Sequence, residues 1–360
     1  MSLRVALVHD KIWQLGGSER VVLALRDVWP DADIFTSAFN PRLVQEHGFG
    51  DVRSTFLQRV PRLHRAHHYF LPFYELAFRG LRLQGYDVVI SSSSMFSKCV
   101  RPRDAPHVCY CHTPIRLLWA DDATVAELPN SLPTKLAVRA MIPWLRQVDR
   151  RAADRVDRFV ANSSFVSQRI RDCYGRDSTV IYPPVDIEAF AGEHPRGDYL
   201  VVVARLFPYK RVDTVIEACN ALRTPLVVVG EGPDRARLEA LAGPTVQFEG
   251  WVEQGEVPAL VGGARALVAP QLEDFGIAMV EAAAAGTPVL AYGEGGAREI
   301  VDAGVSGLFF EKQTVDALVG AIRALDSYRF DRAAMRTRAQ RFSRERFAGE
   351  MRALVEAAVR

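Results

Sequence analysis

From residue 198 onward, short apolar runs alternate with helical patterns, and this alternation limits the possible folds more than any other feature of the sequence. The runs are apolar throughout rather than at every second residue, which is typical of parallel strands covered by helices on both faces. The expected strand and helix pairs are 200–204 with 212–222, 226–230 with 234–241, and 266–270 with 277–285. This half of the chain is therefore predicted to be a doubly wound α/β domain.

The first half of the chain repeats this pattern more loosely, so we expect a second α/β domain. Its strands are predicted at 4–8, 87–91, 107–111, 158–161 and 179–181. Proline, glycine and charged residues concentrate at 182–186 and 191–197, where the alternation of predicted strands and helices is interrupted. This composition predicts a hinge between the two domains. Because 360 residues suffice for about two domains, we expect domains at 1–184 and 185–343. A C-terminal helix over 344–360 is expected to pack back on the first domain.

The composition excludes several classes of protein. The 45 basic and 43 acidic residues leave a net charge of +2, so nucleic acid is not an expected partner. No run approaches the ~18 apolar residues of a membrane span, and the first apolar run is too short for a signal peptide, which together predict a cytoplasmic protein. The five cysteines include no Cys-x-x-Cys pair, and Cys109 and Cys111 are expected as core thiols on one face of a strand.

Residues that follow predicted strands are the candidates for chemistry, because two facing Rossmann-like sheets form a central cleft at the carboxyl ends of their strands. After the first strand, Gly16 and Gly17 precede a helix for which Ser18 is the predicted N-cap. Backbone N–H groups at such a helix start are suited to an anion, and an ordinary turn is the alternative. No Gly-x-Gly-x-x-Gly stands here, which argues against a nicotinamide-dependent oxidoreductase.

Two cations stand in the loop after the predicted strand 200–204. Arg205 and Lys210 are separated by a turn that Pro208 stiffens. A planar guanidinium and a point-charge ammonium at this spacing are suited to clamp a diphosphate. Solvated surface cations are the alternative interpretation.

The segment 270–286 carries two carboxylates around a glycine. Glu273 lies in the loop, Gly276 opens the predicted helix, and Glu281 sits on its second turn among small apolar residues. A carboxylate on an inward-packing face requires partners, and a ribose diol would supply two hydroxyl donors. The alternative, a surface glutamate, would require Glu281 to face out of an almost wholly apolar helix.

The sequence resembles the retaining glycosyltransferases of family 4, which have the two-domain GT-B fold. Glu273 and Glu281 match the family's Glu-x7-Glu motif, and the loop from Arg205 to Lys210 matches its Arg-Leu-x-Pro-x-Lys pattern. Further matches, in family order from residue 5 to about 310, are Gly16-Gly17, His112-Thr113-Pro114, Asn162-Ser163, 182–186, and Gly295-Gly296 with Glu299. Asp274 departs from the pattern, because a glycine commonly follows the first glutamate of the motif.

The resemblance implies a role for each matching residue in binding and using a nucleotide-sugar donor. Arg205 and Lys210 would neutralise the diphosphate and the charge that develops on it as the glycosidic bond breaks. Glu273 would hold the hydroxyls of the donor sugar, Glu281 the ribose, and His112 the sugar or the acceptor. The implied catalytic residues are His112, Arg205, Lys210 and Glu273. The remaining implied donor contacts come from Gly16, Gly17, Trp251, Val252, Phe275, Gly276 and Ile277.

Within the family, residues 110–116, 208–211 and 273–277 look most like the mannosyltransferases of bacterial O-antigen and exopolysaccharide assembly. This likeness implies transfer of a hexose, mannose from GDP-mannose, to a saccharide acceptor carried on a polyprenyl diphosphate. A UDP-sugar donor and a non-catalytic nucleotide-sugar-binding protein stay open as alternatives. No metal or other cofactor is implied, and the leaving phosphate would take the acceptor's proton. Asp31-Ala32-Asp33 is interpreted as having a structural or surface role rather than as an Asp-x-Asp metal site, because it precedes an early strand.

Residues 53–82 form a basic and aromatic segment whose charge differs from the nearly neutral balance of the whole chain. The segment contains six arginines and three histidines but a single acid, Glu75, interleaved with bulky apolar side chains. Such a mixture is typical of a segment that meets an anionic membrane surface, and a core helix with a cationic outer face is the alternative. Because the family's first domain receives the acceptor, we favour peripheral binding at the inner face of the cell membrane.

Overall fold

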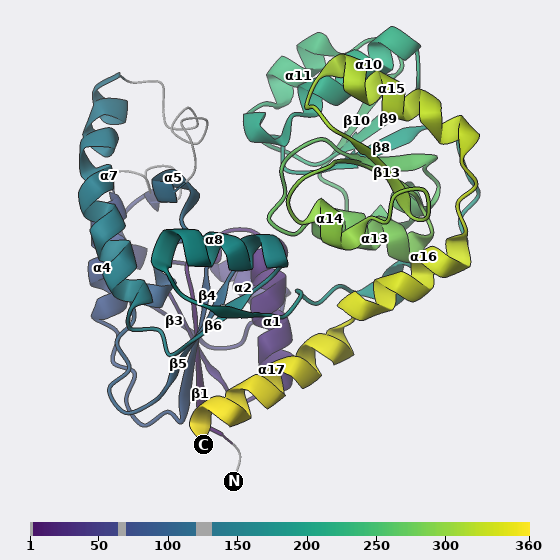
Figure 1. Ribbon diagram of the computed structural model, residues 1–360. Helices are drawn as coiled ribbons and strands as arrows, with labels where there is room; N and C mark the ends of the chain where they lie inside the picture. Colours follow the sequence, from purple (N-terminus) through teal and green to yellow (C-terminus); the bar gives the residue numbers. More distant parts are fainter. Residues whose placement is uncertain (1–2, 64–69, 120–131) are drawn as a thin grey trace. The chain divides into compact units, whose positions relative to one another are not determined.

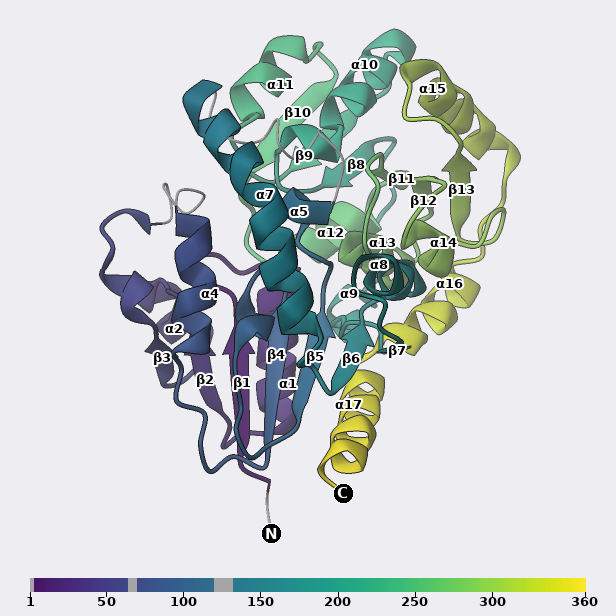
Figure 2. The ribbon, with the colours of Figure 1, turned by 60° about the vertical axis from the view of Figure 1, so that its left-hand side comes forward.

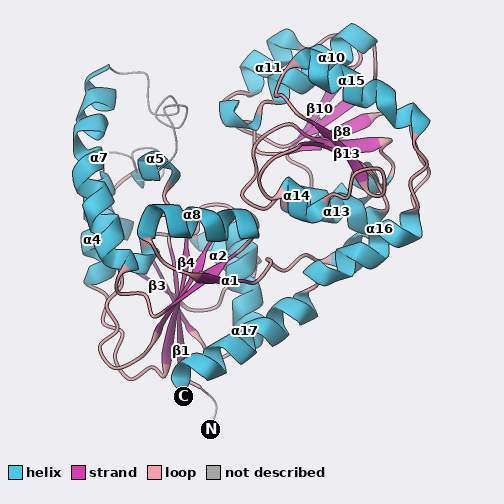
Figure 3. Ribbon diagram, in the orientation of Figure 1, coloured by secondary structure: helices cyan, strands magenta, loops and turns pink. Residues whose placement is uncertain are grey.

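The computed structural model describes residues 3–63, 70–119 and 132–360, and it divides into two compact units. The first unit comprises Met1–Pro184 and Glu345–Arg360, and the second comprises Val185–Arg344. Each unit has its own parallel β-sheet with helices on both faces, as Figure 3 shows by colour. This confirms the prediction of two doubly wound α/β domains.

The first unit is built on a seven-stranded parallel sheet in the order β3-β2-β1-β4-β5-β6-β7 (Figure 2). The strands are β1 (Val5–His9), β2 (Asp33–Thr36), β3 (Val52–Ser54), β4 (Val88–Ser93), β5 (His107–Cys111), β6 (Arg158–Ala161) and β7 (Ser178–Val180). The central strands are buried along their whole length, as expected of a sheet that is covered on both sides.

Two layers of helices cover this sheet. The helices of the unit are α1 (Gly17–Val28), α2 (Pro41–Glu46), α4 (Leu71–Arg79), α5 (Arg116–Trp119), α7 (Leu132–Ala153), α8 (Ser164–Tyr174) and the C-terminal α17 (Arg344–Val359), with short 3-10 turns η1 (Phe56–Arg59) and η3 (Ser97–Cys99). Helices α4 and α7 pack on one face, and α1 and α17 pack on the other. Helix α17 contributes Phe347, Met351 and Val355 to the core of this unit.

The second unit is built on a six-stranded parallel sheet in the order β10-β9-β8-β11-β12-β13. The strands are β8 (Leu200–Val203), β9 (Leu226–Val229), β10 (Val246–Gly250), β11 (Ala266–Ala269), β12 (Val289–Tyr292) and β13 (Gly307–Phe310). The helices are α9 (Ile187–Phe190), α10 (Val212–Leu222), α11 (Arg235–Leu241), α12 (Val257–Gly262), α13 (Ile277–Ala285), α14 (Ala297–Ile300), α15 (Val315–Ala324) and α16 (Arg332–Ala339). Figure 1 shows α10, α11 and α15 on one face of this sheet and α13, α14 and α16 on the other.

Several local predictions are confirmed in detail. Helices α10 and α13 and strands β5 and β6 have the predicted bounds. Cys109 and Cys111 are buried free thiols that face the same core, together with residues of β6 and α8. Within the described residues, no helix is both long enough and apolar enough to span a membrane.

A fully buried ion pair anchors α7 to the turn after β4. Lys98 Nζ lies 2.5 Å from Asp149 Oδ1, and the two side chains are 1% and 0% exposed. The indole N–H of Trp119 and the hydroxyl of Tyr174 both donate to Asp149 Oδ2, each at 2.7 Å. Burial alone lowers the pKa of Lys98, but the Asp149 carboxylate outweighs that effect, so the pKa is raised and the ammonium stays charged.

Removing the charge of Asp149 is expected to destabilise the first unit strongly. In Asp149→Asn the buried ammonium of Lys98 loses its counter-charge, so we expect a loss of about 3–5 kcal/mol in the free energy of unfolding. The matched control is Asp177→Asn, because Asp177 pairs with Arg171 while its side chain is 90% exposed. We expect the control to stay within about 1 kcal/mol of the wild type in urea denaturation. Equal losses in the two variants would contradict the assigned role of the buried pair.

Candidate functional site

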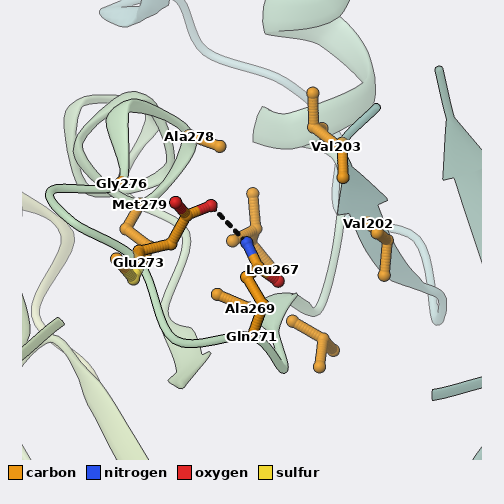
Figure 4. Close-up of a pocket in the computed structure, with 11 residues that line it drawn as sticks. Val202, Val203, Leu267, Ala269, Gln271, Glu273, Gly276, Ala278 and Met279 are labelled. Carbon is orange, nitrogen blue, oxygen red and sulfur yellow. Dashed lines mark hydrogen bonds between the residues drawn. The ribbon is translucent and has the colours of Figure 1, made fainter. Parts of the chain in front are cut away.

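A pocket lies in the second unit at the carboxyl ends of β8 and β11 (Figure 4). Its lining residues come from the ends of these two strands, the loop after β11 and the first turn of α13: Val202, Val203, Ala204, Leu267, Val268, Ala269, Gln271, Glu273, Gly276, Ala278 and Met279. Open parallel sheets bind ligands at this edge, because their strands are apolar and the polar side chains follow the strand ends.

An ion pair between two predicted site residues stands at this pocket. Lys210 Nζ lies 2.6 Å from Glu273 Oε1, and both side chains are mostly buried. The side-chain amide of Gln271 donates to the same carboxylate oxygen, which Figure 4 marks with a dashed line. Lys210 ends the 3-10 turn η4 (Pro208–Lys210), which follows β8. The structure therefore brings together the cationic loop and the first glutamate of the Glu-x7-Glu motif.

A glycine pair fixes the loop that carries Glu273. The N–H of Gly296 donates to the Glu273 carbonyl at 2.9 Å. A Cβ atom at Gly295 would lie 2.4 Å from that carbonyl oxygen, and one at Gly296 would lie 2.4 Å from the carbonyl oxygen of Phe275. No side chain fits at either position, so the pair allows the close backbone approach that holds the loop.

Gly276 lets the chain turn directly from this loop into α13. Its φ of 107° lies in the left-handed region, and a Cβ atom there would lie 2.1 Å from Met279 Cε. Ile277 is the first helical residue, which confirms that Gly276 opens the helix. The Phe275 ring is buried against Phe342, with the ring centroids 5.5 Å apart.

Glu281 lies on the second turn of α13 and is 6% exposed. The helix is buried continuously from Met279 to Ala285, so it has no solvent-facing stripe in this part. The prediction that Glu281 does not face out of the helix is therefore confirmed. A buried carboxylate of this kind must be compensated by hydrogen bonds or charge.

The other predicted donor-site residues of the second unit are more exposed. Arg205 follows β8 as an exposed side chain, and its Nη2 donates to the Tyr209 hydroxyl at 3.2 Å. The Arg205 guanidinium also lies 5.4 Å from the centroid of the Phe207 ring. Trp251, which follows β10, is 74% exposed, and Val252 is half-buried.

In the first unit, the glycine loop begins α1, but its N-cap differs from the predicted one. Gly16 is the N-cap residue and Gly17 the first helical residue, so the prediction of Ser18 as N-cap is wrong. The Glu19 carboxylate explains the shift, because its Oε2 accepts the Gly16 N–H at 3.0 Å and the Ser18 hydroxyl at 2.9 Å. Glu19 thus satisfies the backbone N–H of the N-cap residue, as the glutamate at the third helical position of a capping box does.

His112 follows β5 in the first unit and is held through both its backbone and its ring. The N–H of His112 donates to the Ser93 carbonyl at 2.8 Å, and its carbonyl accepts from the Asn162 amide at 3.0 Å. Its Nε2 lies 2.8 Å from the Ser92 hydroxyl oxygen. Burial lowers the pKa of His112 to about 4, so the imidazole is neutral near pH 7.

Sequence reasoning assigned no role to the two polar residues at the end of β1. His9 and Asp10 are both buried. The Asp10 carboxylate accepts the backbone N–H groups of Ser94, Met95 and Ser97 at 2.6–2.8 Å, and thereby shapes the turn after β4. Their position directly after an apolar strand is the sequence signal that would have identified them.

Within the Asp31-Ala32-Asp33 segment, Asp33 makes contacts to other elements of the first unit, whereas Asp31 is exposed. Asp33 accepts from the Tyr86 hydroxyl at 2.5 Å and pairs with Arg53 at 3.0 Å. In the part of the chain that the structure describes, no group of three or more His, Cys, Asp or Glu side chains is arranged to hold a metal ion.

Two family models match consecutive parts of the chain. The model described as Glycosyltransferase Family 4 matches residues 15–189, and the model described as Glycosyl transferases group 1 matches residues 186–342. Their boundary coincides with the passage between the two compact units.

Characterised relatives and solved structures agree with these models. A GDP-mannose-dependent alpha-(1-6)-phosphatidylinositol monomannoside mannosyltransferase of Mycobacterium tuberculosis is 32% identical over 221 residues, which are 52% of this chain and 57% of the relative. The corresponding dimannoside mannosyltransferase of that organism is 32% identical over 232 residues, 58% of this chain and 59% of the relative. The chain thus spans less than two thirds of the length of either relative.

The fold is also that of a solved structure from Anabaena, HepE in complex with UDP-glucose. That structure has a TM-score of 0.72 at 18% identity and covers 98% of this chain and 99% of its own. Together the two family models run from residue 15 to residue 342 without a gap. The chain therefore belongs to glycosyltransferase family 4 and has the GT-B fold.

Proposed function

We propose that the protein is a retaining, metal-independent hexosyltransferase that moves mannose from GDP-mannose to a saccharide acceptor. The observation that carries this proposal is the Lys210–Glu273 pair at the pocket beyond β8 and β11. Lys210 lies on the same loop as the exposed Arg205. The names of the two mycobacterial relatives support GDP-mannose as the donor. The UDP-glucose complex of HepE keeps a UDP-sugar as the alternative.

In the proposed reaction, two cations stabilise the leaving diphosphate. Arg205 and Lys210 bind its oxygens and stabilise the charge that grows as the glycosidic bond breaks, while Glu273 holds Lys210 and the sugar hydroxyls. The leaving phosphate takes the proton of the acceptor hydroxyl, so Glu273 acts neither as a base nor as a nucleophile. Preorganised protein charges fill the role that a metal ion has in other transferases.

The remaining predicted residues bind the rest of the donor and the acceptor. Glu281 accepts the ribose hydroxyls, and the backbone at Trp251 and Val252 meets the base. The amides near Gly276 and Ile277 and those of Gly16 and Gly17 supply donors to anionic oxygens. His112 contacts the sugar or the incoming acceptor.

We expect GDP release from GDP-mannose, in excess EDTA, to depend on Arg205. Arg205→Ala should lower kcat/KM by about 100-fold or more, on the scale of a lost preorganised donor. The melting temperature should change little, because the side chain is exposed. A comparison with UDP-glucose in the same assay identifies the preferred nucleotide.

The matched control for this experiment is Arg223→Ala, which removes another exposed arginine of the second unit. We expect its kcat/KM to equal that of the wild type. Turnover that survives in Arg205→Ala would remove this loop from the mechanism. A strict need for Mg²⁺ or Mn²⁺ in the chemical step would contradict the metal-independent proposal.

We also propose that the acceptor is lipid-linked and that part of residues 53–82 binds an anionic membrane surface. Within this segment, Phe56 on η1 and Phe73 on α4 are each 48% exposed, and η1 packs against α4. The side chains of Arg59 and Arg62 are exposed as well. An outer face that mixes cations with aromatic rings supports the membrane proposal. Helix α4 also contributes Leu71, Tyr74, Ala77 and Phe78 to the core, so a core helix with a cationic outer face stays the alternative. His64, Arg65, His67, His68 and Tyr69 lie outside the described residues.

Binding to anionic vesicles should depend on the arginines of this segment. Each arginine near the surface adds about 1 kcal/mol of attraction, so the double change Arg59→Glu and Arg62→Glu should abolish cosedimentation with phosphatidylglycerol vesicles at low salt. The control is the double change Arg223→Glu and Arg329→Glu, which alters the net charge by the same amount. Arg62 and Arg223 both have a positive φ, so each double variant replaces one arginine in the same backbone conformation. Equal loss in both variants, or equal binding to neutral vesicles, would contradict the membrane proposal.

A further inference from the structure

A chain of polar side chains in the first unit links the glycine loop before α1 to His112. It runs from Glu19 on α1 through His9 at the end of β1 and Ser92 on β4 to His112 after β5. His9 Nε2 lies 3.6 Å from Glu19 Oε1, and His9 Nδ1 lies 3.1 Å from the Ser92 hydroxyl oxygen. That hydroxyl oxygen is 2.8 Å from His112 Nε2. Glu19, His9 and Ser92 are all more than nine-tenths buried.

The surroundings of His9 require a hydrogen on both of its ring nitrogens. Its Nδ1 lies 3.1 Å from the main-chain carbonyl oxygen of Ser92, which can only accept a hydrogen bond. Its Nε2 faces the Glu19 carboxylate, which also accepts. Burial alone lowers the pKa of His9, but the hydrogen bond and charge of Glu19 outweigh burial, so the pKa is raised.

The charge on His9 sets the direction of the next hydrogen bond. Because His9 Nδ1 carries a hydrogen that is shared between the carbonyl and hydroxyl oxygens of Ser92, the Ser92 hydroxyl does not donate to His9, and its own hydrogen is directed to His112 Nε2. The neutral His112 ring then carries its one hydrogen on Nδ1. Among the described residues, Nδ1 of His112 makes no hydrogen bond, so this N–H is free to meet a ligand.

We propose that Glu19, His9 and Ser92 are positioning residues that hold His112 as the neutral Nδ1–H tautomer, which presents a donor to a hydroxyl of the bound sugar. This inference rests on the proposed function, in which His112 contacts the sugar or the acceptor. The Glu19 carboxylate makes two different contacts. Its Oε2 accepts the Gly16 N–H, and its Oε1 faces His9. A single side chain thus orients both the glycine loop and, through two more side chains, His112.

A neighbouring serine on β4 offers a matched control for Ser92. Ser91 precedes Ser92 on β4, is equally buried, and its hydroxyl oxygen lies 2.8 Å from His107 Nε2. Among the described side chains, neither member of that pair makes a hydrogen bond to His9 or Glu19. Ser91→Ala and Ser92→Ala therefore remove equivalent serine–histidine hydrogen bonds. Only the bond of Ser92 belongs to the proposed relay, by which we mean the series Glu19, His9, Ser92 and His112.

The tautomer of each histidine is measured directly by NMR of protein labelled with ¹⁵N-histidine, and the His112 signals are identified by their absence from His112→Gln. In the wild type without ligand, we expect His112 to carry its hydrogen on Nδ1 at pH 7. Ser92→Ala should move it toward the Nε2–H form and lower kcat/KM for the sugar donor about ten-fold, as expected for one hydrogen bond. Ser91→Ala should change neither.

A wild-type His112 with its hydrogen on Nε2 would overturn the inference, whether or not the serine variants fold. An unchanged His112 tautomer in Ser92→Ala would overturn it as well. The NMR result needs no substrate, so a confirmed tautomer in a protein that transfers no sugar would support the relay while contradicting the proposed function. The two proposals therefore fail separately.

Discussion

Burial of both faces of each parallel sheet is the constraint on which the rest of the structure depends. Strands such as β1, β4, β8 and β11 have nearly no exposed side chain, so polar groups can gather only where these strands end. His9, the serines of β4 and His112 follow this rule in the first unit, and Arg205, Gln271 and Glu273 follow it in the second. A polar site at the carboxyl edge is thus a consequence of how each unit forms its core.

Charges that enter these buried edges are retained by pairing. Lys98 with Asp149, His9 with Glu19 and Lys210 with Glu273 each place a cation against a carboxylate. The Lys98–Asp149 pair lies in the core and holds α7, whereas the Lys210–Glu273 pair stands at a pocket. A buried pair adds little net stability but is costly to break, because the remaining charge has no compensation. The same chemistry therefore supports the fold in one place and stands at a pocket in another.

The sequence predicted the central strands and the positions of the loops that follow them, because short, wholly apolar runs alternate there with helices. It missed β3, which is partly exposed, and it also missed β12 and β13 at the far side of the second sheet. The cap of α1 was misplaced because the side chain of Glu19 reaches back to Gly16. The relay from His9 to His112 joins β1, β4 and β5, whose adjacency follows from the strand order and not from any spacing along the chain.

The central claim is that α13 presents a buried carboxylate to the ribose of a nucleotide. Calorimetric titration of GDP into the wild type and Glu281→Gln tests this claim most directly, together with the melting temperature of each protein without ligand. Charge-assisted hydrogen bonds to two hydroxyls should make GDP bind about ten-fold or more weakly to the variant, with little change in melting temperature. A variant that binds GDP like the wild type but unfolds several degrees earlier would show that Glu281 is a structural carboxylate.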